Sequence, residues 1–293
     1  MKTIYLSVIL LLCAATFATA QERKQLTDDY TVNVEKAGVE PQYLQKYNTN
    51  EGRRSLSDEP VVLEQGDYAI INRYLSFLFS INENGMLHGR AEYRTKKHPD
   101  YMTAFQYDNG VMVASRTLNT ATDSVFSETS LKDSVLTVTK YYPSGQMQEV
   151  EITDYKIKNN AANNIRTTYY ESGQIEKESN KIAQTFKTFS ENGNPKRFVD
   201  DKNGIWISYD EDGTKESHSY RNGDEACMER YAHGVIILKE CTSDKESKTY
   251  RYENGKMTYV EVYNRQTRQT TFFDAKGKPL KDKTPEPIIS IGL

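Results

Sequence analysis

The chain has 293 residues, with 38 basic and 41 acidic side chains and a net charge of −3 at pH 7. With Gly counted and Tyr left out, about 35% of the residues are apolar, below the roughly 45–50% of an average globular chain, so we do not expect a thick core. The lack of excess positive charge argues against nucleic acid as a partner, and 21 Tyr with only 8 Pro argue against disorder.

The first twenty residues predict a secretory signal peptide. Met1-Lys2 supplies one positive charge, an apolar run follows from Ile4 to Ala15, and Ala18-Thr19-Ala20 is an A-x-A cleavage site. The run is too short for a membrane-spanning helix, which needs about 20 apolar residues. We therefore expect export to the periplasm or the cell surface, with no transmembrane segment after cleavage.

The next segment, residues 21–67, is polar and has no clear periodicity. We expect it to be partly flexible, with a loop over residues 46–60. Apolar residues then alternate from Leu75 to Ile81, which predicts a strand, and the runs at 125–130 and 134–142 predict a hairpin. No long stretch has the 3.6-residue period of an amphipathic helix.

Glycines preceded by turn-forming residues recur through the second half of the chain. An aromatic residue lies three or four positions before each of them, and an apolar residue or Pro follows two positions after most. Five of the six intervals between them are 20–22 residues long. These predicted turn glycines are Gly145, Gly173, Gly193, Gly213, Gly234, Gly255 and Gly277.

A hairpin explains this repeat. A tight turn between antiparallel strands needs a backbone with positive φ, which Gly adopts without a side-chain clash. The aromatic residue before the turn and the apolar residue after it can then share one face. Because a lone hairpin cannot bury its apolar face, successive hairpins must stack. The sequence predicts an all-β fold in which antiparallel β-hairpin repeats form an elongated sheet or solenoid.

Cys227 and Cys241 remain after signal cleavage, and both lie seven residues from Gly234. Exported proteins keep disulfides, and a turn at Gly234 would bring the two thiols together across a hairpin if they share a face. We expect a Cys227–Cys241 disulfide, with two separate buried thiols as the alternative.

The segments Tyr-Tyr-Glu-Ser-Gly-Gln-Ile (169–175), Tyr-Tyr-Pro-Ser-Gly-Gln-Met (141–147) and Tyr-Glu-Asn-Gly-Lys-Met (252–257) resemble the MORN-repeat variant of exported bacterial proteins. The resemblance covers residues 68–282 and is clearest over 136–282, which leaves a tail at 283–293. It implies β-hairpin repeats without a catalytic centre of their own. The chain departs from the pattern at Gly223-Asp224-Glu225, which puts the strand register near Cys227 in question.

The sequence contains no recognisable catalytic, cofactor-binding or metal-binding set. The four His lie apart in turn-like or charged surroundings, and no Gly-x-Ser-x-Gly, His-Glu-x-x-His or phosphate-binding loop is present. Asp210 and Asp212 fit part of a calcium loop, but its twelfth position is Ser219 where Glu is needed, so a turn is favoured. The repeated aromatics are expected to form the narrow core. Trp206 and Tyr209 are the best candidates for a ligand-binding platform.

Three functions remain open. We favour an exported, non-enzymatic repeat scaffold that binds a protein or glycan partner of the bacterial envelope. The second hypothesis is a carbohydrate-active enzyme that uses paired carboxylates on the aromatic face. The third is an immunity or antitoxin-like partner of a toxin, against which the export signal argues.

Overall fold

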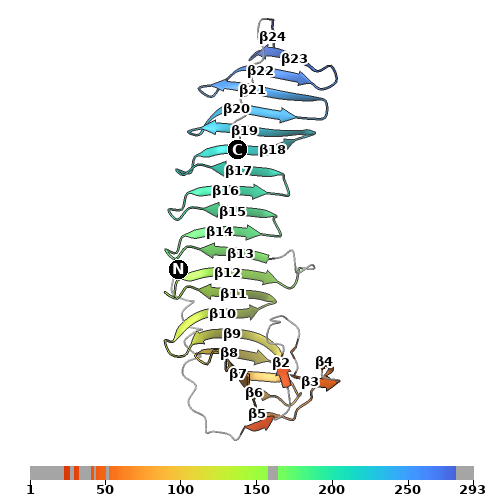
Figure 1. The fold of residues 1–293 in the computed structure, drawn as a ribbon, viewed down its shortest axis with the longest axis vertical. Helices are drawn as coiled ribbons and strands as arrows, with labels where there is room; N and C mark the ends of the chain where they lie inside the picture. Colours follow the sequence, from red (N-terminus) through yellow and green to blue (C-terminus); the bar gives the residue numbers. More distant parts are fainter. Residues whose placement is uncertain are drawn as a thin grey trace. The chain divides into compact units, whose positions relative to one another are not determined.

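The computed structural model describes residues 23–26, 30–32, 41–42, 44–50, 53–157 and 164–281. The described residues form strands and turns and contain no helix, as expected for an all-β protein (Figure 1). No helix in this part of the chain has the length and apolar character needed to cross a membrane. The predicted signal peptide and the tail at 283–293 lie outside the described residues.

The chain divides into two compact units, residues 1–145 and residues 146–293. In the first unit, the strands from β5 to β11 each pair antiparallel with the next, and β1 pairs parallel with β5. These strands are β1 (Lys24–Leu26), β5 (Gly66–Ile71), β6 (Leu75–Ile81), β7 (Leu87–Thr95), β8 (Tyr101–Asp108), β9 (Val111–Asn119), β10 (Ser124–Lys132) and β11 (Val135–Tyr141).

A second, three-stranded sheet in this unit comprises β2 (Tyr30–Val32), β3 (Leu44–Asn50) and β4 (Arg53–Pro60). The prediction of a loop over residues 46–60 is therefore wrong. Polar composition suggested a loop, but strand pairing satisfies backbone groups whatever the side chains are. The Gln42 amide donates to the Gly110 carbonyl at 2.8 Å, which ties this segment to the turn after β8.

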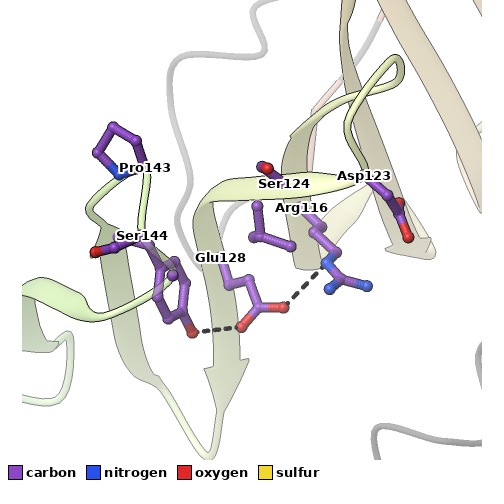
Figure 2. A pocket seen from close by; sticks show the side chains of 9 residues that line it. Arg116, Asp123, Ser124, Glu128, Pro143 and Ser144 are labelled. Carbon is purple, nitrogen blue, oxygen red and sulfur yellow. Dashed lines mark hydrogen bonds and ion pairs between the residues drawn. The ribbon is translucent and has the colours of Figure 1, made fainter.

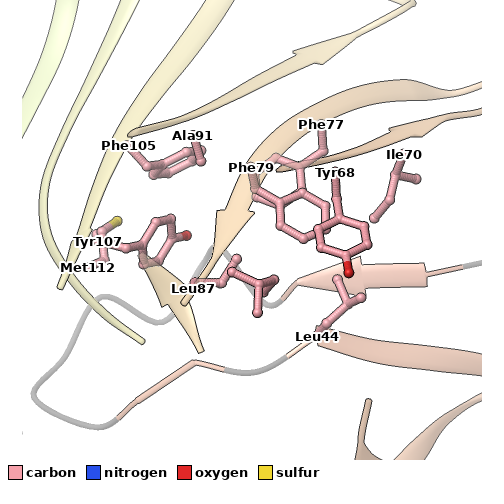
Figure 3. Packing of buried hydrophobic residues seen from close by; sticks show 11 residues of the cluster. Leu44, Tyr68, Ile70, Phe77, Phe79, Leu87, Ala91, Phe105, Tyr107 and Met112 are labelled. Atoms are coloured by element: carbon pink, nitrogen blue, oxygen red, sulfur yellow. The ribbon is translucent and has the colours of Figure 1, made fainter. Parts of the chain in front are cut away.

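The first unit has a buried hydrophobic core on one face of β5–β9. Alternate residues of β6 point into it, because successive side chains of a strand face opposite sides. Figure 3 shows Leu44 of β3 beside Tyr68 and Ile70 of β5. The core consists of Leu44, Tyr68, Ile70, Phe77, Phe79, Ile81, Leu87, Ala91, Phe105, Tyr107 and Met112.

The second unit is a succession of antiparallel strands joined by short turns, and Figure 1 shows them in chain order from β12 to β24. The strands are β12 (Met147–Asp154), β13 (Asn164–Tyr169), β14 (Ile175–Asn180), β15 (Thr185–Phe189), β16 (Pro195–Asp200), β17 (Ile205–Tyr209), β18 (Lys215–Asn222), β19 (Glu225–Ala232), β20 (Val235–Thr242), β21 (Glu246–Glu253), β22 (Lys256–Asn264), β23 (Gln269–Asp274) and β24 (Pro279–Leu280). The prediction of stacked hairpin repeats is confirmed.

All seven predicted turn glycines have positive φ and lie between consecutive strands. At Gly213, φ is +84° and the amide donates to the Asp210 carbonyl at 3.0 Å. Successive glycine turns also contact each other. The Asn194 side-chain amide donates to the Glu211 carbonyl at 3.2 Å, and a Cβ on Gly213 would lie 3.3 Å from Asn194.

A one-residue bulge follows most of these turns. In the β19–β20 hairpin, Tyr231 pairs with Ile236 and Arg230 pairs with Leu238, so Ile237 is the extra residue. Closer to the turn than the bulge, the aromatic residue before the turn and the apolar residue after it are directly opposite, on one face. The pairs are Tyr169–Ile175, Phe189–Pro195, Tyr231–Ile236, Tyr252–Met257 and Phe273–Pro279.

The same bulge places the cysteines opposite each other. Without it, the two-residue turn at Gly234 would pair Cys227 with Glu240. With it, Cys227 pairs with Cys241, and the Cα atoms are 4.1 Å apart and joined by a disulfide. The predicted disulfide is confirmed. The extra glycine, Gly223, lies in the turn between β18 and β19 and leaves the Cys227–Cys241 register intact.

The sheet of the second unit has two faces, which we name after residues of β17. The Trp206 face carries Trp206 and Ser208, and the Tyr209 face carries Ile205, Ile207 and Tyr209. The row of paired aromatic and apolar residues lies on the Tyr209 face. Over residues 146–157 and 164–281, the buried residues are few: Glu149, Val199, Cys227, Cys241 and Phe272.

Candidate functional site on the Trp206 face

Trp206 and Tyr209 do not form one platform. They lie three residues apart in β17. The bulge next to Tyr209 has its extra residue, Glu216, in the partner strand β18, so the side chains of β17 keep alternating and these two point to opposite faces. Tyr209 belongs to the row of aromatic residues beside the turns. Trp206 is 39% exposed and is the aromatic side chain that this part of the sheet presents to solvent.

An apolar strip lies next to Trp206. Phe186 of β15 pairs with Val199 of β16, which pairs with Trp206 of β17. Val199 is only 6% exposed, because the two rings flank it in register. The indole is thereby supported on one side while its outer surface remains accessible. An exposed, laterally supported indole is suited to stacking on a flat ligand.

Arginine and serine side chains surround this ring on the same face. Arg197, Ser208, Ser217 and Arg230 form a row across β16, β17, β18 and β19, since each pairs with the next. The Ser208 and Ser217 hydroxyl oxygens are 2.7 Å apart, which confirms that they share a face. Both arginines are exposed.

Arg221 lies near the C-terminal end of β18 and approaches the Trp206 ring from there. Ser219 pairs with Trp206, and Arg221 lies two residues further along the strand, on the same face. A Cβ on Gly204 would lie 3.8 Å from Arg221 Cγ and 3.9 Å from the Trp206 ring. The arginine stem and the indole therefore converge above the turn at Gly204.

The charge balance of this patch is positive. Its basic residues are Arg197, Arg221, Arg230 and Lys196, the extra residue of the β15–β16 bulge. The acidic residue nearest the serine row is Glu216, whose carboxylate accepts a hydrogen bond from the Ser208 hydroxyl at 3.2 Å. Within the described part of the chain, no salt bridge neutralises the three arginines.

The arginines were missed by sequence reasoning because they are scattered along the chain. Their common face depends on strand register, including each bulge. One signal could have located Arg197: it lies four residues after Gly193, directly beyond the bulge, as Lys177 does after Gly173. Residues at this position face the Trp206 side in every repeat that carries the bulge.

The first unit contains a pocket of about 350 Å³ beside β9–β11 (Figure 2). Within it, Arg116 Nε lies 3.2 Å from one oxygen of Glu128, and the Tyr141 hydroxyl donates to the other oxygen at 2.7 Å. Burial, with help from this hydrogen bond, raises the pKa of Tyr141 to about 12. The three groups satisfy one another, which is typical of a structural network.

A second network lies on the Tyr209 face, next to the disulfide. The Glu229 carboxylate accepts hydrogen bonds from the Tyr220 and Tyr231 hydroxyls at 2.9 and 2.5 Å, and His218 Nδ1 lies 3.3 Å away. Burial opposes ionisation of Glu229, but these hydrogen bonds outweigh it and lower its pKa. Lys239 lies over the Tyr220 ring at 5.4 Å. The network joins β18, β19 and β20.

The residues of the partial calcium-loop pattern, which include Asp210 and Asp212, form a turn. Asp210 and Asp212 both accept a hydrogen bond from the Thr214 amide, at 2.9 and 2.8 Å, and Asp210 also accepts one from the Thr214 hydroxyl at 2.6 Å. These carboxylates therefore close the loop between β17 and β18.

Comparison with known proteins gives one match to a family. Residues 163–180 match the MORN repeat variant. This segment includes β13, the turn at Gly173 and β14, so the family motif corresponds to one hairpin. The protein is thus a β-hairpin repeat scaffold, and it carries a MORN repeat variant.

Other comparisons add little. No curated protein matches the chain. A solved structure described as "Crystal Structure of TcdB2-TccC3-Cdc42" is similar over 78% of this chain, with 12% sequence identity and a TM-score of 0.17. The chain spans 16% of that protein's length.

Proposed function

We propose that the protein is an exported, non-enzymatic scaffold whose Trp206 face binds a glycan or protein of the bacterial envelope. The observation that carries this proposal is the exposed indole of Trp206, surrounded by arginines and serines on β16–β19. A residue of this size and apolarity is usually covered, and exposed aromatic and arginine side chains are enriched where proteins bind partners.

Two features of the second unit support a binding role. Among its described residues few are buried, and both faces of the sheet carry half-buried and exposed side chains. The large apolar residues that strands β17–β22 leave exposed include Trp206, Val235 and Tyr263, which all lie on the Trp206 face. Repeat scaffolds use such extended surfaces to bind ligands.

Export is the second element of the proposal. It is supported by the signal-like segment at residues 1–20 and by the Cys227–Cys241 disulfide, since disulfides persist in oxidising compartments. The proposed location is the periplasm or the cell surface. Expression of the full chain with a C-terminal tag, followed by cell fractionation and N-terminal sequencing, tests it: a mature protein that begins at Gln21 supports export, and an unprocessed cytosolic chain contradicts it.

Neither rival function has a specific observation in its favour. Two carboxylates near the aromatic residues, Asp210 and Glu229, are engaged in a turn and in a hydrogen-bond network. For the toxin-partner hypothesis, no residue of the Trp206 face points to a particular protein. We therefore retain the binding scaffold.

Binding assays on an array of envelope glycans and on a purified envelope protein fraction test the proposal. We expect to find a ligand that binds the wild-type protein and binds the Trp206→Ala variant at least tenfold more weakly. The matched control is Tyr263→Ala, which removes an equally exposed ring from the same face but on β22. Equal binding by the two variants would overturn the assignment of function to β16–β19.

A further inference from the structure

We propose that the ligand of the Trp206 face is an anionic polysaccharide. Trp206 stacks on a sugar ring, and Arg197, Arg221 and Arg230 bind the carboxylate or sulfate groups of the polymer. This inference rests on the proposed binding function of the same face and specifies the chemistry of the ligand.

The first step concerns the shape of the site. Strands β16–β19 are interior strands, each paired on both sides, so an extended peptide cannot add to them as an extra strand. A ligand must instead lie across the flat surface and be recognised by side chains alone. Sugar rings, with apolar C–H faces and hydroxyl edges, suit an exposed indole with hydroxyls beside it.

The second step concerns charge. The whole chain is acidic, with a net charge of −3, yet on this face of strands β16–β19 the exposed charged residues are Lys196, Arg197, Arg221 and Arg230 against Glu216. Arg197, Arg221 and Arg230 form no salt bridge with any residue that the structure describes, so a polyanion can supply a partner to each of them. The guanidinium group binds carboxylates and sulfates with two parallel hydrogen bonds, so arginine suits this role better than lysine.

The third step concerns length. Arg197 and Arg230 stand at the two ends of a row that crosses three strand spacings, roughly 14 Å at the usual spacing of about 4.8 Å. A single sugar cannot span this distance, whereas a chain of several sugars can. Between the arginines lie Ser208 and Ser217, whose hydroxyl groups can exchange hydrogen bonds with sugar hydroxyls. The site therefore fits a polymer with repeated negative charges.

The test uses the purified full-length mature protein and biolayer interferometry. Its probes are polygalacturonate, which carries carboxylates, dextran sulfate, which carries sulfates, and neutral dextran. Two other polyanions are included for comparison. Poly-L-glutamate has carboxylates but no sugar rings, and single-stranded DNA has a phosphate backbone. We expect at least one of the two anionic polysaccharides to bind, with affinity that falls as salt rises, and neutral dextran not to bind.

Three variants identify the residues. Arg197→Ala/Arg230→Ala should weaken polysaccharide binding at least tenfold and reduce its salt dependence. Arg197→Lys/Arg230→Lys retains the charge but removes the bidentate geometry, so its affinity should lie between those of the wild type and of Arg197→Ala/Arg230→Ala. The matched control is Lys187→Ala/Lys215→Ala, which removes two positive charges from the Tyr209 face and should change affinity less than twofold.

The outcomes separate this inference from the proposed function. The polysaccharide assignment would be overturned if Arg197→Ala/Arg230→Ala and the control Lys187→Ala/Lys215→Ala lost the same affinity for the polysaccharide. It would also be overturned if poly-L-glutamate or DNA bound as tightly as the polysaccharides. A ligand that is lost on Trp206→Ala but unaffected by either arginine variant would refute the anionic class while leaving the binding face in place. If no ligand depends on Trp206 or on the arginines, both proposals fail.

Discussion

The two units of this protein are built from the same antiparallel strands but are stabilised differently. In the first unit, eleven residues form a buried core that includes Phe79 and Leu87, each at most 2% exposed. In the second, the buried apolar residues among those that the structure describes are Val199, Cys227, Cys241 and Phe272. Repeated strands therefore hold together without a thick core when neighbouring strands are linked by backbone hydrogen bonds, contacts between turns, pairs of an aromatic and an apolar side chain, and a disulfide.

The largest predicted effect lies in the core of the first unit. Phe79→Ala should lower the free energy of unfolding by about 3–5 kcal/mol, because it removes a fully buried ring and leaves a cavity. Phe189→Ala is the matched variant in the second unit and should cost about 1–2 kcal/mol, since this ring is only half-buried. Urea denaturation measures both. If the two variants lost the same free energy of unfolding, the two units would not differ in how much they depend on a buried core.

Loss of the disulfide is the next largest effect. Cys227→Ser/Cys241→Ser should destabilise the second unit by roughly 3 kcal/mol, because the bond closes a loop of about 14 residues and restricts the unfolded chain. The measurement is the thermal midpoint of the wild-type protein with and without reductant. The double variant serves as control, since reductant should not change its midpoint. An unchanged wild-type midpoint would show that the repeats do not depend on this crosslink.

Contacts between successive turns can be measured with two glycine substitutions. Gly213→Ala and Gly173→Ala both force a side chain into a positive-φ conformation, at a cost of about 1–2 kcal/mol. At Gly213 the new Cβ also meets Asn194 and Pro195 at 3.3 Å, whereas nothing lies within 4 Å at Gly173. Gly213→Ala should therefore be the more destabilising variant in thermal denaturation. If the two variants are equally stable, neighbouring turns do not support each other.

The smallest effect is a pH dependence from the Glu229 network. Burial disfavours the Glu229 carboxylate, but the tyrosine hydroxyls and His218 outweigh it, so its folded-state pKa is below the unfolded value. This lowering contributes stability above the unfolded pKa, near 4.5, and that stability is lost as pH falls through the folded pKa.

The thermal midpoint of Glu229→Gln should therefore be lower than that of the wild type at pH 7, and the difference should shrink at pH 3. Glu253→Gln is the control, because Glu253 is exposed at the end of β21. A difference that is the same at both pH values would contradict a role for the charged carboxylate.

Much of the second unit could be predicted from the sequence, because a hairpin turn requires positive φ and Gly meets that requirement at regular intervals. The pairing of Tyr231 with Ile236 follows from the turn at Gly234, whereas the direct pairing of Cys227 with Cys241 also needs the bulge at Ile237. The sheet of β2–β4 could not be predicted, since its strands are polar and lack alternation. Of the Trp206 site, the sequence identified Trp206 but not its arginines. Placing Arg197, Trp206 and Arg230 on one face requires the register and bulges of four strands, which spacing alone does not reveal.

The most direct test of the account asks which face of the second unit a ligand covers. Ser219→Cys places a thiol on the Trp206 face and Thr185→Cys places one on the Tyr209 face, both in otherwise wild-type protein with the native disulfide intact. The rate of maleimide labelling is then measured with and without the anionic polysaccharide that binds. The account predicts that the ligand slows labelling at Ser219→Cys and leaves Thr185→Cys unchanged. Protection of Thr185→Cys alone would contradict it.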